Sequence, residues 1–203
     1  MHKELGQNGD SAIMTLQANA AAVESLASDG YYHVVCRDQD GNVKWEDGFE
    51  NQVMQVGKIL AMNTLLYTAS GYTLVGPYLG LITSSTGYSA TDTMASHSDW
   101  TEFTNYTVGG SAVRGTAVFA TATGNNVTTA GSNIVTSSAS AITYTITGAG
   151  GIVAGCFLVT GTGATNVISS TTGTLWSAGG FAVAKTTTAG DTVTVTYSTT
   201  ATS

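Results

Sequence analysis

The chain has 203 residues, of which only 9% are charged, and its formal net charge at pH 7 is −7. An ordinary soluble domain has about 25% charged residues, so hydroxyl and amide groups must hydrate much of this surface. With only 6 Lys and Arg residues, the composition excludes a protein that binds phosphate backbones, because such binding needs clustered basic side chains.

Residues 1–30 are predicted to form a helical arm, with the helix itself over about 11–27. Asp10 or Ser11 can cap the free amides of its first turn. Apolar residues at helical spacing form one stripe along it: Ile13, Leu16, Ala20, Val23 and Ala27. We expect this stripe to lie on another surface, which is either a neighbouring subunit or the chain's own domain.

A β-hairpin is predicted next, at the start of a body that spans residues 31–203. Residues 31–37 and 42–47 are β-prone and flank Asp40-Gly41, a dipeptide that favours the positive φ angles of a tight turn. The sequence DQDGN at 38–42 also resembles the start of a calcium-binding loop. The glutamate which that loop needs is absent at the required spacing, so we interpret the segment as a hairpin turn.

Apolar residues then recur at helical spacing, which predicts a second helix over about 50–67. From residue 77 onward the period changes to two, in short β-branched or aromatic runs separated by Gly, Ser, Thr and Asn. In the last run, Val193, Val195 and Tyr197 alternate with threonines, which predicts one apolar face and one hydroxyl face. The pattern predicts a mainly β protein, an antiparallel β-sandwich or jelly roll. The Ser- and Thr-rich stretch 121–141 is expected to be an irregular loop or an edge strand within that fold.

The sequence contains no apolar run near the ~18 residues of a membrane span, and MHKELGQNGD at the N-terminus lacks the apolar stretch of a signal peptide. We therefore expect a protein that folds in a cytoplasm and has no membrane partner. Cys36 and Cys156 lie far apart in different kinds of sequence, and we expect both to be reduced.

The strongest polar cluster is TDTMASHSDWTEF, which contains Asp92, His97, Asp99 and Glu102. Three carboxylates and an imidazole are able to bind a metal ion, but such residues also cap turns in loops that precede a strand. We interpret them as capping residues, and assign no catalytic, cofactor-binding or metal-ligating residue. The motifs of phosphate loops, dinucleotide sites, nucleophile elbows and zinc hydrolases are all absent from the sequence. We therefore expect a protein that is not an enzyme and carries no cofactor.

The order of segments resembles a family of structural proteins of tailed-bacteriophage virions, whose members are often labelled tail fibre proteins. The resemblance rests on YYHVVCRDQDGNVKWEDGFENQVMQVGKILAMNTLL, PYLGLI, TDTMASHSDWTEFTNYT, GCFLVT, GTLWSAGGFA and AGDTVTVTYS, and covers about residues 31–198. ATDTMASHSDWTEFTNY is its most specific part.

The resemblance implies a capsid cement or decoration protein, located on the capsid surface of the virion. Its partners would be the major capsid protein and further copies of itself, as a homotrimer, with no nucleic acid. A tail fibre or receptor-binding appendage is the alternative function. A virion glycosidase is disfavoured, because paired carboxylates in the β-rich half are confined to one short segment.

Overall fold

The structure is a computed structural model that describes residues 27–66, 75–121, 123–124 and 134–202. The described residues begin at position 27, so residues 11–26 of the helix predicted over 11–27 lie outside them. Strand β1 begins at Ala27, so the last residues of the predicted arm belong to the sheet. Of the predicted arm over 1–30, the structure therefore describes only residues 27–30.

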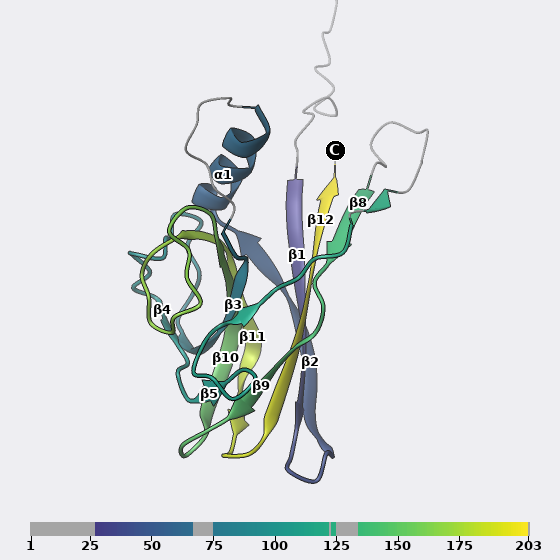
Figure 1. The fold of residues 1–203 in the computed structure, drawn as a ribbon, viewed down its shortest axis with the longest axis vertical. Coiled ribbons are helices and arrows are strands. Elements are labelled where there is room, and N and C mark those ends of the chain that lie inside the picture. The colour runs from purple at the N-terminus through teal and green to yellow at the C-terminus, as the bar shows by residue number, and fades with distance from the viewer. Residues whose placement is uncertain (1–26, 67–74, 122, 125–133, 203) are drawn as a thin grey trace, which may run out of the picture.

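The described residues form a mainly β, antiparallel structure with one helix, curled into a half-barrel (Figure 1). Its strands belong to one 12-stranded sheet in which β4, β3, β10, β11, β2, β1, β12, β8 and β7 lie side by side in that order. The long strands are β1 (Ala27–Arg37), β2 (Val43–Val53), β3 (Tyr78–Ser85), β10 (Gly151–Thr160), β11 (Thr174–Thr187) and β12 (Thr192–Thr202). The short ones are β4 (Trp100–Glu102), β5 (Tyr106–Thr107), β6 (Gly115–Thr116), β7 (Thr123–Gly124), β8 (Ile134–Ser138) and β9 (Ile142–Ile146).

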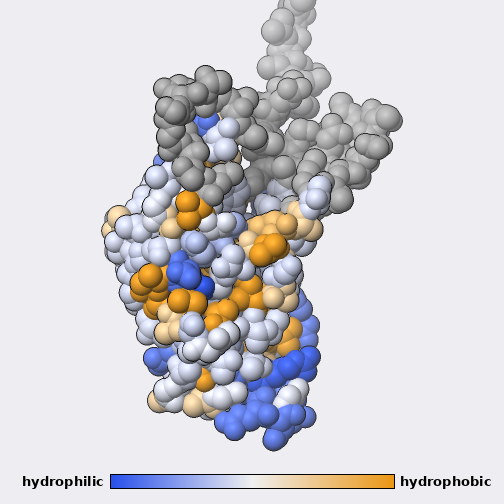
Figure 2. Space-filling view, viewed as in Figure 1, coloured by the Kyte–Doolittle hydropathy of each residue, from blue (hydrophilic) through white to orange (hydrophobic). Residues whose placement is uncertain are grey.

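The predicted hairpin is confirmed, and its strands are longer than expected. β1 and β2 pair antiparallel from Gly30↔Asn51 to Arg37↔Val43. In the turn, Gly41 has a φ of 86°, a conformation that glycine adopts without strain. The Asp38 carboxylate accepts hydrogen bonds from the backbone N–H groups of Asp40 and Asn42. The carboxylate at this position therefore closes the turn, and Figure 2 shows hydrophilic surface gathered at this end of the molecule.

The helix predicted over 50–67 begins later than expected, because α1 spans Gln55–Leu66. Residues 50–53 instead end strand β2, where they pair with β1 on one side and with Ser177 and Ala178 of β11 on the other. Backbone pairing with two neighbours outweighs the helical spacing of this stretch. Gly57 then lets α1 lie directly on β11, since a Cβ at that position would come within 2.8 Å of the Trp176 carbonyl oxygen.

The core lies between the two halves of the sheet. On β12, Val193, Val195 and Tyr197 are fully buried while the alternating threonines remain partly exposed, which confirms the predicted two-faced strand. The main core cluster joins residues of β1 and β12 to Leu79, Leu81 and others on β3 and β10. Buried hydroxyls link the halves as well: Tyr144 donates to the Leu79 carbonyl at 2.8 Å. One core is therefore shared by strands from both ends of the sheet.

The sheet splits where β2 leaves β11. Their backbones pair at Val53 and Gln52 alone. In β11, residues 181–184 lie between the pairs Gly155↔Gly180 and Val153↔Lys185, so four residues face one residue of β10. The Phe181 ring fills the split, with its centroid 5.6 Å from that of Trp45 and 4.8 Å from that of Phe49. This bulge allows one continuous sheet to fold over a core.

The weaker sequence predictions are confirmed in part. The stretch 121–141 was expected to be an irregular loop or an edge strand. Within it, β8 pairs with β12 on one side and with β7 on the other, so the described part forms edge strands. Between Ser111 and Ala120, the described residues form a named strand only at Gly115–Thr116. Val113 and Phe119 add isolated bridges to Val167 and Ala139.

Candidate functional site

The polar cluster at 92–102 is dispersed into separate interactions. Asp92 is buried, and its Oδ2 accepts hydrogen bonds from the Trp100 indole N–H and the Ser89 backbone N–H, each at 3.1 Å. The carboxylate therefore fixes a buried tryptophan and caps a loop, which agrees with the capping interpretation.

His97 lies flat on Trp100, with ring centroids 3.7 Å apart and an interplanar angle of 16°. Its Nδ1 is 3.1 Å from the Trp100 carbonyl oxygen. Asp99 is exposed, and its carboxylate accepts a hydrogen bond only from the neighbouring Ser98 hydroxyl among the described residues. The imidazole and the two aspartates thus serve different local contacts and do not converge on one point.

Glu102 forms a buried ion pair with Arg114. The guanidinium donates through Nε to Oε1 at 2.9 Å and through Nη2 to Oε2 at 2.8 Å. It also donates to the carbonyl oxygens of Thr165 and Ser170 and lies over the Phe157 ring, 5.1 Å from its centroid. This network ties strand β4 to the loop that precedes β11.

Ser169 completes the same network. It has a φ of 64°, in the left-handed region that non-glycine residues rarely adopt. In this conformation its backbone N–H donates to Glu102 Oε2 at 2.8 Å. Every Glu102 carboxylate oxygen is therefore occupied by a donor of the protein itself.

Two further ion pairs join segments that are distant in the sequence. Lys44 on β2 pairs with the buried Asp191 at 2.6 Å, and Lys185 on β11 pairs with Asp47 on β2 at 2.6 Å. Burial acts to raise the pKa of Asp191, but the Lys44 ammonium and the Thr188 N–H outweigh it and lower this pKa below its ordinary value. The sequence analysis missed these pairs. Its one signal was the scarcity of charged residues after position 100, where each of the four, Glu102, Arg114, Lys185 and Asp191, has an ionic partner.

Both cysteines are buried and unpaired. Burial, together with the nearby Asp191 carboxylate, raises the pKa of the Cys36 thiol to about 11. Burial alone raises the pKa of the Cys156 thiol. At neutral pH both residues are therefore protonated thiols packed in the core, a state that disfavours nucleophilic attack.

Metal-binding clusters and membrane-spanning helices are both absent from the described residues. Within 27–66, 75–121, 123–124 and 134–202, His, Cys, Asp and Glu side chains nowhere gather in groups of three or more that could hold a metal ion. None of the helices in this part of the chain has the length and apolar character needed to span a membrane.

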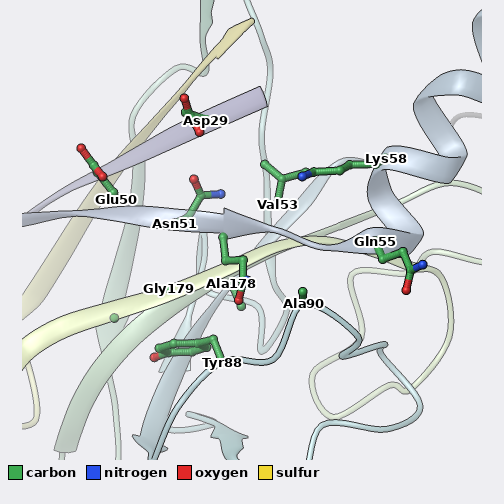
Figure 3. A pocket seen from close by; sticks show the side chains of 12 residues that line it. Asp29, Glu50, Asn51, Val53, Gln55, Lys58, Tyr88, Ala90, Ala178 and Gly179 are labelled. Atoms are coloured by element: carbon green, nitrogen blue, oxygen red, sulfur yellow. The ribbon is translucent and has the colours of Figure 1, made fainter. Parts of the chain in front are cut away.

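A cavity lies beside the start of β1, the end of β2 and the first turns of α1 (Figure 3). Its volume is about 720 Å³. The lining combines charged, amide and apolar groups: Asp29, Glu50, Asn51, Gln52, Val53, Gln55, Lys58, Tyr88, Ala90, Ala178, Gly179 and Gly180. Sequence analysis did not find it, because four separate stretches of the chain contribute and none carries a local motif.

Comparisons of the sequence with models of known families, with curated proteins and with solved structures found no match. The function must therefore be argued from the residues and the geometry above.

Proposed function

We propose that this chain is a structural protein of a tailed-bacteriophage virion. It acts there as a capsid cement or decoration protein that binds the major capsid protein and stabilises the shell. It assembles as a homotrimer on the capsid surface. The body is a β-sandwich of the jelly-roll kind, and the part of the predicted arm that precedes strand β1, residues 1–26, is helical and reaches a neighbouring subunit.

One observation carries the proposal: the charged residues of the β-rich half are used to hold the framework together. Glu102, Arg114, Lys185 and Asp191 each form an ion pair with a residue of this same chain. The Glu102–Arg114 pair is buried on both sides, and a buried pair is costly to separate. Charged residues that are few and all engaged in internal ion pairs suit a protein that keeps its shape under mechanical load. The same pairing leaves these groups unavailable for catalysis.

The layering supports the sandwich assignment. Strands β1 and β12 pack against β3 and β10 around one core, so the two halves of the sheet face each other. Apolar side chains also remain exposed at separate points of the surface, including Val118, Val167 and Val183. Shallow contacts of this kind become strong when symmetry repeats them across a shell.

Copy number tests the proposal. We expect quantitative mass spectrometry of purified virions to give a ratio to the major capsid protein that is close to a whole-number stoichiometry. Purified protein should also bind isolated shells that lack it and raise their melting temperature. A few copies per particle, together with recovery in isolated tails, would contradict the cement role and favour the tail appendage.

A further inference from the structure

We infer that the cavity beside β1, β2 and α1 binds an arginine side chain carried by an extended segment of a partner protein. We call this cavity the β2–α1 pocket, defined by the lining residues given above. With about 720 Å³ it has the size of a ligand site. The inference does not depend on which particle the partner belongs to.

Two carboxylates at one end of the pocket lack a cation. Asp29 and Glu50 are exposed and lie on neighbouring strands, since Glu50 pairs with Tyr31, two residues beyond Asp29. On adjacent strands such diagonal neighbours lie within reach of one long side chain. Neither carboxylate forms an ion pair among the described residues, whereas Asp47, Glu102 and Asp191 all do. This end of the pocket therefore carries uncompensated negative charge.

An amide oxygen in the lining is also unsatisfied. Asn51 donates from Nδ2 to the Tyr197 hydroxyl at 3.2 Å, while its Oδ1 is buried and has no hydrogen-bond partner. A buried acceptor without a donor is costly. Because this oxygen is buried against Gly30 and Tyr197, the exposed acceptors that a ligand meets are the Asp29 and Glu50 carboxylates.

The remaining lining suits the aliphatic stem of a long side chain. Val53, Ala178 and Ala90 present apolar surface, and the Tyr88 ring lies beneath them in Figure 3. Gly179 lets β11 lie close to β2 beside the pocket, because a Cβ there would come within 3.0 Å of the Glu50 carbonyl oxygen and Asn51 Cα. Lys58 lies on the α1 side and has no ionic partner among the described residues. The Lys58 ammonium group would bind an acidic group of the same partner segment and so fix the direction in which that segment runs.

Arginine matches this arrangement better than the other ligands of similar size. Its planar guanidinium carries five donors and no acceptor, and it recognises carboxylates through paired hydrogen bonds. A neutral sugar offers hydroxyls that both donate and accept, so it would leave the two carboxylates without a counter-charge. The net charge of −7 further favours the approach of a basic segment.

The test is an NMR titration of the full chain with acetyl-Gly-Arg-Gly-amide. The matched ligand is the citrulline peptide, which has nearly the same shape and no charge. The test variant is Asp29→Asn with Glu50→Gln. The control variant is Asp40→Asn with Asp99→Asn, which removes the same charge from two exposed carboxylates outside the pocket.

We expect the arginine peptide to shift the amide resonances of Asn51, Lys58 and Gly179, and the citrulline peptide to bind at least about fivefold more weakly. Asp29→Asn with Glu50→Gln should weaken the arginine peptide about fivefold or more, and the control variant less than about twofold. Equal losses in both variants, or shifts centred on the β1–β2 turn, would overturn the inference. Shifts of the same amides by maltotriose but not by the arginine peptide would also overturn it, in favour of a saccharide site. Because the titration uses no capsids, its result and that of the copy-number experiment are independent.

Discussion

Arg114 and Glu102 are joined by two hydrogen bonds inside the protein, and their side chains are 0% and 8% exposed. Desolvating both charges offsets much of their attraction, so the pair contributes modest net stability. Breaking it is a different matter, because the remaining charge stays buried. The pair therefore acts as a lock on the arrangement of β4 and the loop before β11.

We expect Glu102→Leu to lower the free energy of unfolding by about 3–5 kcal/mol, since it leaves the Arg114 guanidinium buried without its carboxylate. Glu102→Leu combined with Arg114→Met should cost less than Glu102→Leu alone, because neither charge then remains. Urea denaturation at pH 7 measures Glu102→Leu, Arg114→Met and the double variant. A double variant whose loss equals the sum of the two single losses would show that the residues are not coupled.

The Lys44–Asp191 pair predicts a dependence of stability on pH. The pKa of Asp191 is lowered in the folded protein, where the effect of Lys44 and Thr188 exceeds that of burial. A lowered pKa contributes stability above the unfolded value of about 3.9, and this contribution is lost as the pH falls through the folded pKa. Asp191→Asn should therefore cost about 1–3 kcal/mol at pH 7, and progressively less below about pH 4.

Unfolding by urea at several pH values between 3 and 7 checks this prediction. Asp40→Asn is the control, because Asp40 is exposed and its side chain forms no hydrogen bond or ion pair among the described residues. A loss for Asp191→Asn that stays constant over the whole pH range would mean that the lowered pKa does not stabilise the fold.

Periodicity predicted the parts of this fold that neighbouring residues decide. Val193, Val195 and Tyr197 face the core because alternate side chains of a strand point to one face. The predicted start of the second helix was wrong. A helical and an extended conformation both fit residues 50–53, and pairing with β1 and β11 decides between them. The pattern of residues 50–53 alone does not reveal that these two strands pair with them.

The ion pairs and the pocket were beyond sequence analysis for a related reason. Lys44 and Asp191 are 147 positions apart, and only the antiparallel order of β2, β1 and β12 brings them together. Conversely, Asp92, His97, Asp99 and Glu102 are close in sequence, yet their backbone directs them to separate partners. Proximity along the chain was therefore a poor guide to which polar groups meet.

The hydrogen bond between Asp92 and Trp100 predicts which residue of that cluster matters for stability. Asp92→Ala should lower the free energy of unfolding by about 1–3 kcal/mol, because the buried indole N–H loses its acceptor. Asp99→Ala should change it by less than about 0.5 kcal/mol, since Asp99 is exposed.

Thermal unfolding with and without EDTA provides a further measurement, and we expect the same melting temperature in both. A lower melting temperature in EDTA would show that a metal ion links these residues.

The start of β1 at Ala27 sets the boundary for a truncation. We expect deletion of residues 1–26 to leave a folded β body, because the described strands begin at Ala27 and pack around two core clusters. If the proposed arm contacts a neighbouring subunit, this body should bind shells more weakly than the full chain. Circular dichroism checks the fold and co-sedimentation with shells checks the binding. Equal affinity of the two proteins would remove the arm from the proposed function.

Gly155 on β10 faces Gly179 and Gly180 across the strand pair, and the Tyr88 hydroxyl lies over the same spot. A Cβ at position 155 would lie 2.1 Å from the Gly179 carbonyl oxygen, an atom that cannot move without disturbing β11. We therefore expect Gly155→Ala to cost about 1–3 kcal/mol through overpacking. Gly87→Ala is the matched control, because a Cβ there meets no atom within 4 Å. It should be neutral or stabilise by up to about 1 kcal/mol, since it restricts the unfolded chain. Urea denaturation of both variants measures the difference, and equal stabilities would mean that β10 and β11 separate easily at this point.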